Sequence, residues 1–189
     1  MQKNTLALSR GGALGRFADA SAGQKIALAV FGSLLLAASS RIEVPMIPVP
    51  MTMQTYALLL LGAFLGSRLA FASVLAYLAE GALGLPVFAG GAAGLQHFFG
   101  PTAGYLLAFP FAAYIVGLAA ERGWLGNLFI AFLVMLASHA IVFTGGVAWL
   151  AQFMDVSKAV AVGFTPFVLG TLVKSALGVA TVQLWPRRA

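Results

Sequence analysis

Long apolar segments, separated by short polar stretches or by stretches rich in glycine and proline, dominate the pattern of this chain. Six such segments can be counted, and each is interpreted as a membrane-spanning helix. They cover residues 26–39, 52–65, 69–83, 101–120, 125–143 and 159–184. A helix perpendicular to a membrane needs about 20 residues to cross about 30 Å of hydrocarbon. The first three segments are shorter than this, whereas the last is long enough to tilt.

The composition supports the same interpretation. Hydrophobic residues make up 61% of the 189 residues, charged residues make up 8%, and the mean hydropathy is +0.97. A water-soluble surface needs many more charges than this. We therefore predict an all-α integral membrane protein, a compact bundle of six transmembrane helices. Residues 1–24 are predicted to form a short cytoplasmic extension, and residues 25–189 the six-helix membrane domain.

Lysine and arginine residues predict how the bundle is oriented. With six spans, only Arg41 and Lys158 fall on one side, and Lys174 lies within the last span. The opposite side, with both termini, holds Lys3, Arg10, Arg16, Lys25, Arg68, Arg122, Arg187 and Arg188. Because basic residues concentrate on the cytoplasmic side, both termini are predicted to be cytoplasmic, in a bacterial inner membrane. The net charge of +6 is thus interpreted as a topology signal and not as a nucleic-acid-binding surface.

The first apolar segment has an alternative interpretation as a signal peptide. The apolar run 26–36 follows a basic N-terminus, and the small residues 37–39 could form a cleavage site. Cleavage would leave five spans and would spoil the distribution of basic residues. A retained first helix is therefore favoured.

Two of the predicted outer segments have unusual compositions. Pro45, Pro48 and Pro50 should keep the first loop extended and stiff, because proline fixes φ and restricts its predecessor. Such a loop could be a simple linker between helices. Its apolar residues favour the other interpretation, in which the loop is a preformed wall that covers a pocket. Further along, seven glycines lie within the 24 residues 81–104, where the backbone could approach a ligand closely. Close helix packing is the other use of glycine in membranes, but this cluster is dense for that purpose alone.

Three motifs carry a resemblance to a known family. They are VPMIPVPMTMQT at residues 44–55, GLPVFAGG at 84–91 and GPTAGY at 100–105. These motifs closely resemble the signature of the BioY family, the biotin-binding S components of energy-coupling-factor (ECF) vitamin importers. Within these three motifs, Ala103 stands where the family usually has glycine.

The resemblance implies a high-affinity biotin-binding membrane subunit, not an enzyme, with biotin as the transported ligand and no cofactor. The chain has no phosphate-binding loop. Driven uptake would therefore require a transmembrane coupling protein and two cytoplasmic ATPase subunits, although some family members are thought to act without them. Two rival functions remain open, an S component for another vitamin and a small membrane enzyme. The second would need a nucleophile–base pair or clustered acids deep in the bundle.

Asp155 and Lys158 are the leading candidates for ligand contact. They lie three residues apart at the outer entrance to the last segment, so one helical turn would place them on the same face. From the spacing alone, an interfacial ion pair explains them equally well. The resemblance favours ligand contact, because BioY proteins are understood to read biotin with an aspartate and a lysine at this place. The other predicted substrate-binding residues are Gly90, Gly91, Phe88, Tyr105, Gln54, Pro48 and Trp149.

For two further polar residues, two roles each remain open. Glu80 could face the pocket or a helix interface, and Lys174 could reach the membrane surface or pair internally. His97 and His139 are isolated, and the chain has no cysteine, so no metal site is predicted.

The first helix offers a candidate surface for a partner protein. Ala29, Ser33 and Ala37 recur every four residues, which permits close helix–helix contact in lipid. S components share an Ala-x-x-x-Ala element on this helix that docks the coupling protein, and the match here is Ala29-x-x-x-Ser33. Packing within the bundle is the alternative.

Overall fold

The structure is a computed structural model that describes residues 20–185. Its helices are α2 (Ala22–Ser40), α3 (Gln54–Leu65), α4 (Ser67–Ala82), α5 (Ala103–Glu121), α6 (Leu128–Leu150), α7 (Val156–Gly163) and α8 (Val168–Leu184). Short 3-10 turns lie at η2 (Ala89–Gly91), η3 (Leu95–Phe98), η4 (Trp124–Gly126) and η5 (Thr165–Phe167). The predicted helical architecture is thereby confirmed. Most of the predicted extension 1–24 lies outside the described residues.

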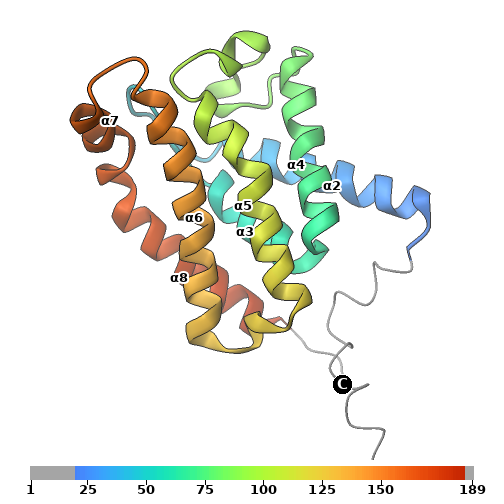
Figure 1. Cartoon of the computed structure of the whole chain (residues 1–189). Coiled ribbons are helices and arrows are strands. Elements are labelled where there is room, and N and C mark those ends of the chain that lie inside the picture. Colours follow the sequence, from blue (N-terminus) through green and yellow to red (C-terminus); the bar gives the residue numbers. More distant parts are fainter. Residues whose placement is uncertain (1–19, 186–189) are drawn as a thin grey trace, which may run out of the picture.

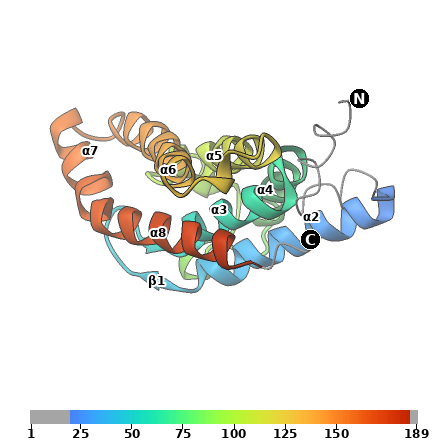
Figure 2. The same ribbon diagram turned by 90° about the horizontal axis from the view of Figure 1, so that it is seen from below.

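The helices form two layers around α3. Figure 1 shows α4, α5 and α6 side by side, and α5 is the most enclosed of the candidate spans, with 72% of its apolar part buried. Figure 2 places α2 and α8 on the other side of α3. The apolar part of α2 is only 22% buried, and that of the stretch Val156–Leu184, which contains α7 and α8, is only 17% buried. The core of the bundle therefore lies along α5, while α2 and α8 present broad apolar surfaces outward.

Four stretches of the described chain are long and apolar enough to cross a membrane. They are Ala22–Ser40, Ala103–Glu121, Leu128–Leu150 and Val156–Leu184. Helix α3 is apolar but has only 12 residues, and α4 has 16. This agrees with the short second and third segments of the sequence pattern. The number of complete crossings remains a prediction.

Two predicted boundaries are wrong for identifiable reasons. Helix α6 continues to Leu150, so residues 144–150 are helical where a loop was predicted. This part of α6 packs closely on α5, because a Cβ atom on Gly146 would overlap the Tyr105 ring and one on Gly145 would be tight against Gly104. The last predicted span is broken between α7 and α8 at η5, which contains Pro166. Proline cannot donate the helical hydrogen bond that an unbroken helix would need there.

The proline-rich loop is closed at its base by a short β-ribbon. Strands β1 (Glu43–Val44) and β2 (Met51–Thr52) pair antiparallel, with Glu43 opposite Thr52 and Val44 opposite Met51. The loop that they enclose carries Val49 inward, 5% exposed, and Ile47 outward, 97% exposed. This alternation gives the loop one face for the interior of the protein and one for its surroundings.

Candidate functional site

A cavity of about 330 Å³ lies at the end of the bundle that carries the proline-rich and glycine-rich loops. Its volume falls within the range of roughly 300–1,000 Å³ that small-molecule sites occupy. The loops supply one wall, and α3, α5, α6 and α8 supply the others. Segments far apart in the sequence therefore meet around a single space.

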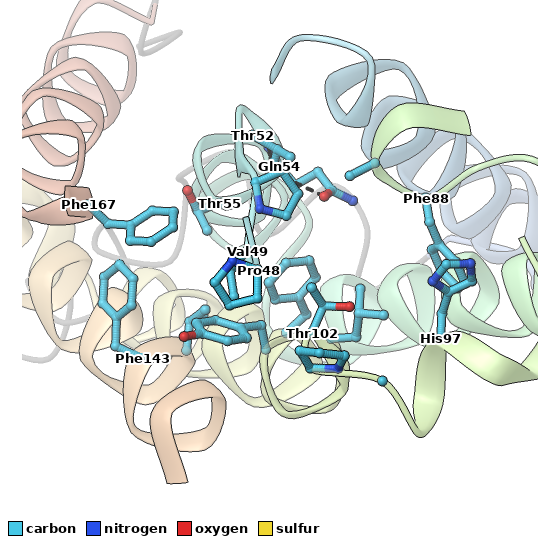
Figure 3. A pocket seen from close by; sticks show the side chains of 18 of the residues that line it. Pro48, Val49, Thr52, Gln54, Thr55, Phe88, His97, Thr102, Phe143 and Phe167 are labelled. Atoms are coloured by element: carbon cyan, nitrogen blue, oxygen red, sulfur yellow. Dashed lines mark hydrogen bonds between the residues drawn. The ribbon is translucent and has the colours of Figure 1, made fainter. Parts of the chain in front are cut away.

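Aromatic side chains stand at two ends of this cavity (Figure 3). Phe143 of α6 and Phe167 of η5 face each other at one end, with ring centroids 5.7 Å apart. Phe88 and His97 pack edge to face at the other end, 5.7 Å apart. Pro48 and Val49 of the proline-rich loop lie between the two ends. The result is an apolar slot with flat walls, which suits a compact ring system.

The position of Phe88 depends on a glycine in the preceding helix. A Cβ atom on Gly81 would overlap the Phe88 ring, so no larger residue fits there without displacing that ring. Tyr77, one turn earlier on α4, packs edge to face against the same ring at 5.5 Å. The cavity wall at Phe88 is thus built on α4, although Phe88 itself belongs to a loop.

Polar groups lining the cavity are few and are mostly neutral. They are Thr52, Gln54, Thr55, His97, Thr102, Thr171 and Lys174. Among the described residues that line the cavity there is no aspartate or glutamate, and Lys174 is the only lysine or arginine. Within residues 20–185, no three histidine, cysteine or acidic residues come together in a way that could hold a metal ion.

Lys174 reaches the cavity from α8 and holds the end of the proline-rich loop. Its Nζ donates to the Thr52 carbonyl oxygen at 2.6 Å and to Thr55 Oγ1 at 3.2 Å. An ammonium group has three donors. One therefore remains for a ligand.

Gln54 stands beside the same loop end and is 3% exposed. Its Oε1 accepts from Thr52 Oγ1 at 3.1 Å, and its Nε2 donates to the Tyr77 hydroxyl. Lys174 and Gln54 thus both bond to Thr52, so a cationic donor and an amide acceptor lie next to each other on one wall.

The structure brings four of the predicted binding residues to the cavity. Pro48, Gln54, Phe88 and Tyr105 all line it. The Tyr105 hydroxyl donates to the Gly163 carbonyl oxygen at 2.9 Å, so its proton is not available to a ligand.

Three other predicted residues lie outside the lining. Gly90 and Gly91 form the η2 turn with φ of 65° and 78°, a conformation that favours glycine. They lie close to the side chains of Glu43 and Arg41. Trp149 belongs to α6, where its Nε1 donates to the Gly100 carbonyl oxygen at 3.0 Å, so it holds a loop that lines the cavity.

Asp155 and Lys158 do not line the cavity. Both are exposed at the start of α7, and Asp155 makes no capping hydrogen bond there. Within the described chain the two side chains also form no ion pair within 4.0 Å. The break at η5 explains this placement, because the cavity wall is formed by α8 and not by α7. The predicted ligand contact of this pair has no support from the cavity.

The predicted docking row on α2 is partly buried. Ser33 has 0% exposure, and its hydroxyl bonds to Glu80 Oε1 of α4 at 2.7 Å. Ala29 and Ala37 are half-buried. The row therefore faces α4, as in the alternative of packing within the bundle, and Glu80 lies at a helix interface. The exposed side of α2 carries Ala27, Val30, Phe31, Leu34 and Ala38.

Lys174 is a charged cavity residue that the sequence interpretation did not assign to the site. A usable signal was present, since an ionisable residue in an apolar helix is costly and is a functional candidate by default. Thr171 and Lys174 also have the three-residue spacing that drew attention to Asp155 and Lys158, and both line the cavity.

Together, the apolar outer surface, the helical bundle and the cavity under the loops define a small membrane protein with a solute-binding site. The chain belongs to the BioY family, which it matches over residues 13–189. It is 36% identical to the probable biotin transporter BioY of Pyrococcus horikoshii over 85% of this chain and 94% of that protein. It is 37% identical to the biotin transporter BioY of Thermotoga maritima over 80% and 88% of the two chains.

A solved structure shares the fold. It is the S-component for biotin from an ECF-type ABC transporter, with a TM-score of 0.73 and 26% sequence identity. The match covers 90% of this chain and 96% of that one.

Proposed function

We propose that this chain is the biotin-binding S component of an ECF-type importer in a bacterial cytoplasmic membrane. The names of its relatives and of the structural neighbour support this function. The cavity supports it independently, since its size, flat apolar walls and few polar groups suit a small ring compound.

The adjacent donor and acceptor at Lys174 and Gln54 are the observation that carries the proposal. The ureido ring of biotin presents a carbonyl oxygen beside N–H groups. Lys174 Nζ would donate to the ureido oxygen with its remaining hydrogen, and Gln54 Oε1 would accept from the neighbouring N–H. Both protein groups already bond to Thr52, which keeps them on the same part of the cavity wall.

The apolar part of biotin would occupy the rest of the slot. Its fused rings would pack against the proline-rich loop at Pro48 and Val49 and between the aromatic ends at Phe88 and Phe143. Burial of apolar surface is worth roughly 25 cal/mol per Å², so most of the affinity would come from these walls. The polar pair would supply specificity.

The partners implied by this function are a transmembrane coupling protein and two cytoplasmic ATPase subunits. Helix α2 would dock the coupling protein with its exposed side, at Val30, Phe31 and Leu34. In this arrangement Ser33 holds α2 onto α4 and does not touch the partner. The six-span topology with both termini in the cytoplasm belongs to the same proposal, with residues 25–189 as the membrane domain.

A binding assay tests the function. Detergent-purified protein should bind biotin with high affinity and should not bind riboflavin or thiamine at comparable concentrations. Preference for either of those vitamins would assign the chain to a different substrate. Absence of binding to all three vitamins would contradict the proposal.

A further inference from the structure

Tyr77 of α4 has a fully buried side chain that makes polar contacts at one end. Tyr77 does not line the cavity. Its hydroxyl nevertheless contacts Gln54, which lines the cavity, and the backbone that leads to Phe88. The hydroxyl donates to the Val87 carbonyl oxygen at 3.2 Å and accepts from Gln54 Nε2. Tyr77 thus links two separate parts of the cavity wall.

The direction of these hydrogen bonds is determined by the Val87 carbonyl. That oxygen can only accept, and it also receives the Ser40 hydroxyl at 2.8 Å. Tyr77 has a single hydroxyl proton, which it gives to Val87. With that proton on the Val87 side, the bond between Tyr77 and Gln54 runs from the amide Nε2 to the phenol oxygen.

This direction fixes the orientation of the Gln54 amide. With Nε2 held by Tyr77, the other end of the amide is the carbonyl oxygen Oε1, which receives one hydrogen bond from Thr52 Oγ1. A carbonyl oxygen has two acceptor positions, so one remains. A flipped amide would instead present two donors there and would face the tyrosine with its oxygen.

We propose that Tyr77 is a positioning residue that makes the site selective for ligands with a free N–H group. It does so by keeping Gln54 Oε1, and not Nε2, available to the ligand. The inference rests on the proposed function, because it specifies how the same site recognises a ureido group. Tyr77 itself touches no ligand.

The matching experiment compares biotin with biotin methylated at its ureido nitrogens. Methylation removes the N–H donors, so the wild-type protein should bind the methylated ligand at least about ten-fold more weakly. Tyr77→Phe frees the amide to flip, so biotin binding should weaken. The ratio of the dissociation constants of methylated and unmethylated biotin should then approach one. The ratio of the two dissociation constants is the readout.

A matched control removes a tyrosine hydroxyl elsewhere. Tyr56→Phe deletes the hydrogen bond between Tyr56 and Thr181, which joins α3 to α8 at 2.7 Å and lies away from the cavity lining. The preference for unmethylated biotin should persist in this variant. If it is lost there as well, the effect in Tyr77→Phe is general loosening and the proposal fails.

A rescue variant separates orientation from packing. In Tyr77→Phe/Gln54→Glu, both ends of the side chain are acceptor oxygens, so either rotamer accepts from an N–H group and the preference should return. Its failure to return would contradict the proposal, as would an unchanged ratio in Tyr77→Phe.

If Tyr77→Phe does not fold, Gln54→Met removes the amide and leaves Tyr77 bonded to Val87. Loss of the preference is then expected, and its persistence overturns the inference. Absence of biotin binding by the wild-type protein would instead refute the proposed function, so the two failures are distinguishable.

Discussion

Lys174 Nζ lies 2.6 Å from the backbone carbonyl oxygen of Thr52, a residue 122 positions earlier in the chain. This hydrogen bond ties α8 to the end of the proline-rich loop and places the ammonium on the cavity wall. The cost of holding a cation inside a membrane protein is offset here by oxygen acceptors on two sides. A ligand oxygen can complete the set.

Substitution of this lysine gives the first prediction. Lys174→Ala should weaken biotin binding by about 2–5 kcal/mol, or roughly thirty- to several-thousand-fold, because a desolvated charged partner is lost. The matched control is Lys158→Ala, which removes the exposed lysine of α7 and should leave the affinity nearly unchanged. Isothermal titration of both purified variants measures the difference. If biotin affinity fell only in Lys158→Ala, the binding site would lie at α7 instead.

The second prediction concerns the support of Phe88. Gly81→Ala should displace the Phe88 ring, because its new methyl group occupies the space of that ring. Overpacking of this kind costs about 1–3 kcal/mol. Biotin affinity should also fall, because the displaced ring no longer forms the cavity wall at Phe88.

Gly126→Ala is the control for this substitution, because nothing lies within 4 Å of a Cβ atom at that position. It should keep wild-type affinity and thermal stability. If Gly81→Ala behaves in the same way, the Phe88 wall does not depend on α4.

The parts of the site that the sequence predicted are those carried by compact motifs. Pro48, Gln54, Phe88 and Tyr105 belong to three short segments whose composition already departs from that of a membrane helix. Proline and glycine act locally on the backbone, so their effect can be inferred without knowing the fold. The helical architecture was predictable for a similar reason, since it follows from long apolar runs.

The cation of the site was harder to predict because its position depends on tertiary structure. Asp155 and Lys158 have a suitable spacing, but the break at η5 separates α7 from α8. Only the folded chain shows that α8 reaches the proline-rich loop. The burial of Ser33 was equally hidden, because a row of small residues suits an internal interface as well as an external one.

The third prediction tests topology with single cysteines, since the chain has none of its own. Ile47→Cys lies at a 97%-exposed loop position on the predicted outer side and should react with a membrane-impermeant maleimide in intact cells. Gly126→Cys lies on the opposite side, in η4, and should react only after the cells are permeabilised. The opposite labelling pattern would invert the proposed orientation.

The two sides of α2 give the last prediction. Ser33→Leu should destabilise the protein by about 1–3 kcal/mol, because it forces a larger side chain into a fully buried position and removes the hydrogen bond to Glu80. Biotin binding and assembly with the coupling protein should fall together.

Leu34→Trp changes the neighbouring residue, which is 58% exposed, and should leave folding and biotin binding intact. It should nevertheless block co-purification with the coupling protein, because the added bulk lies on the proposed docking surface. Intact assembly in Leu34→Trp would place that surface on another helix, and wild-type stability in Ser33→Leu would show that the contact between α2 and α4 is loose.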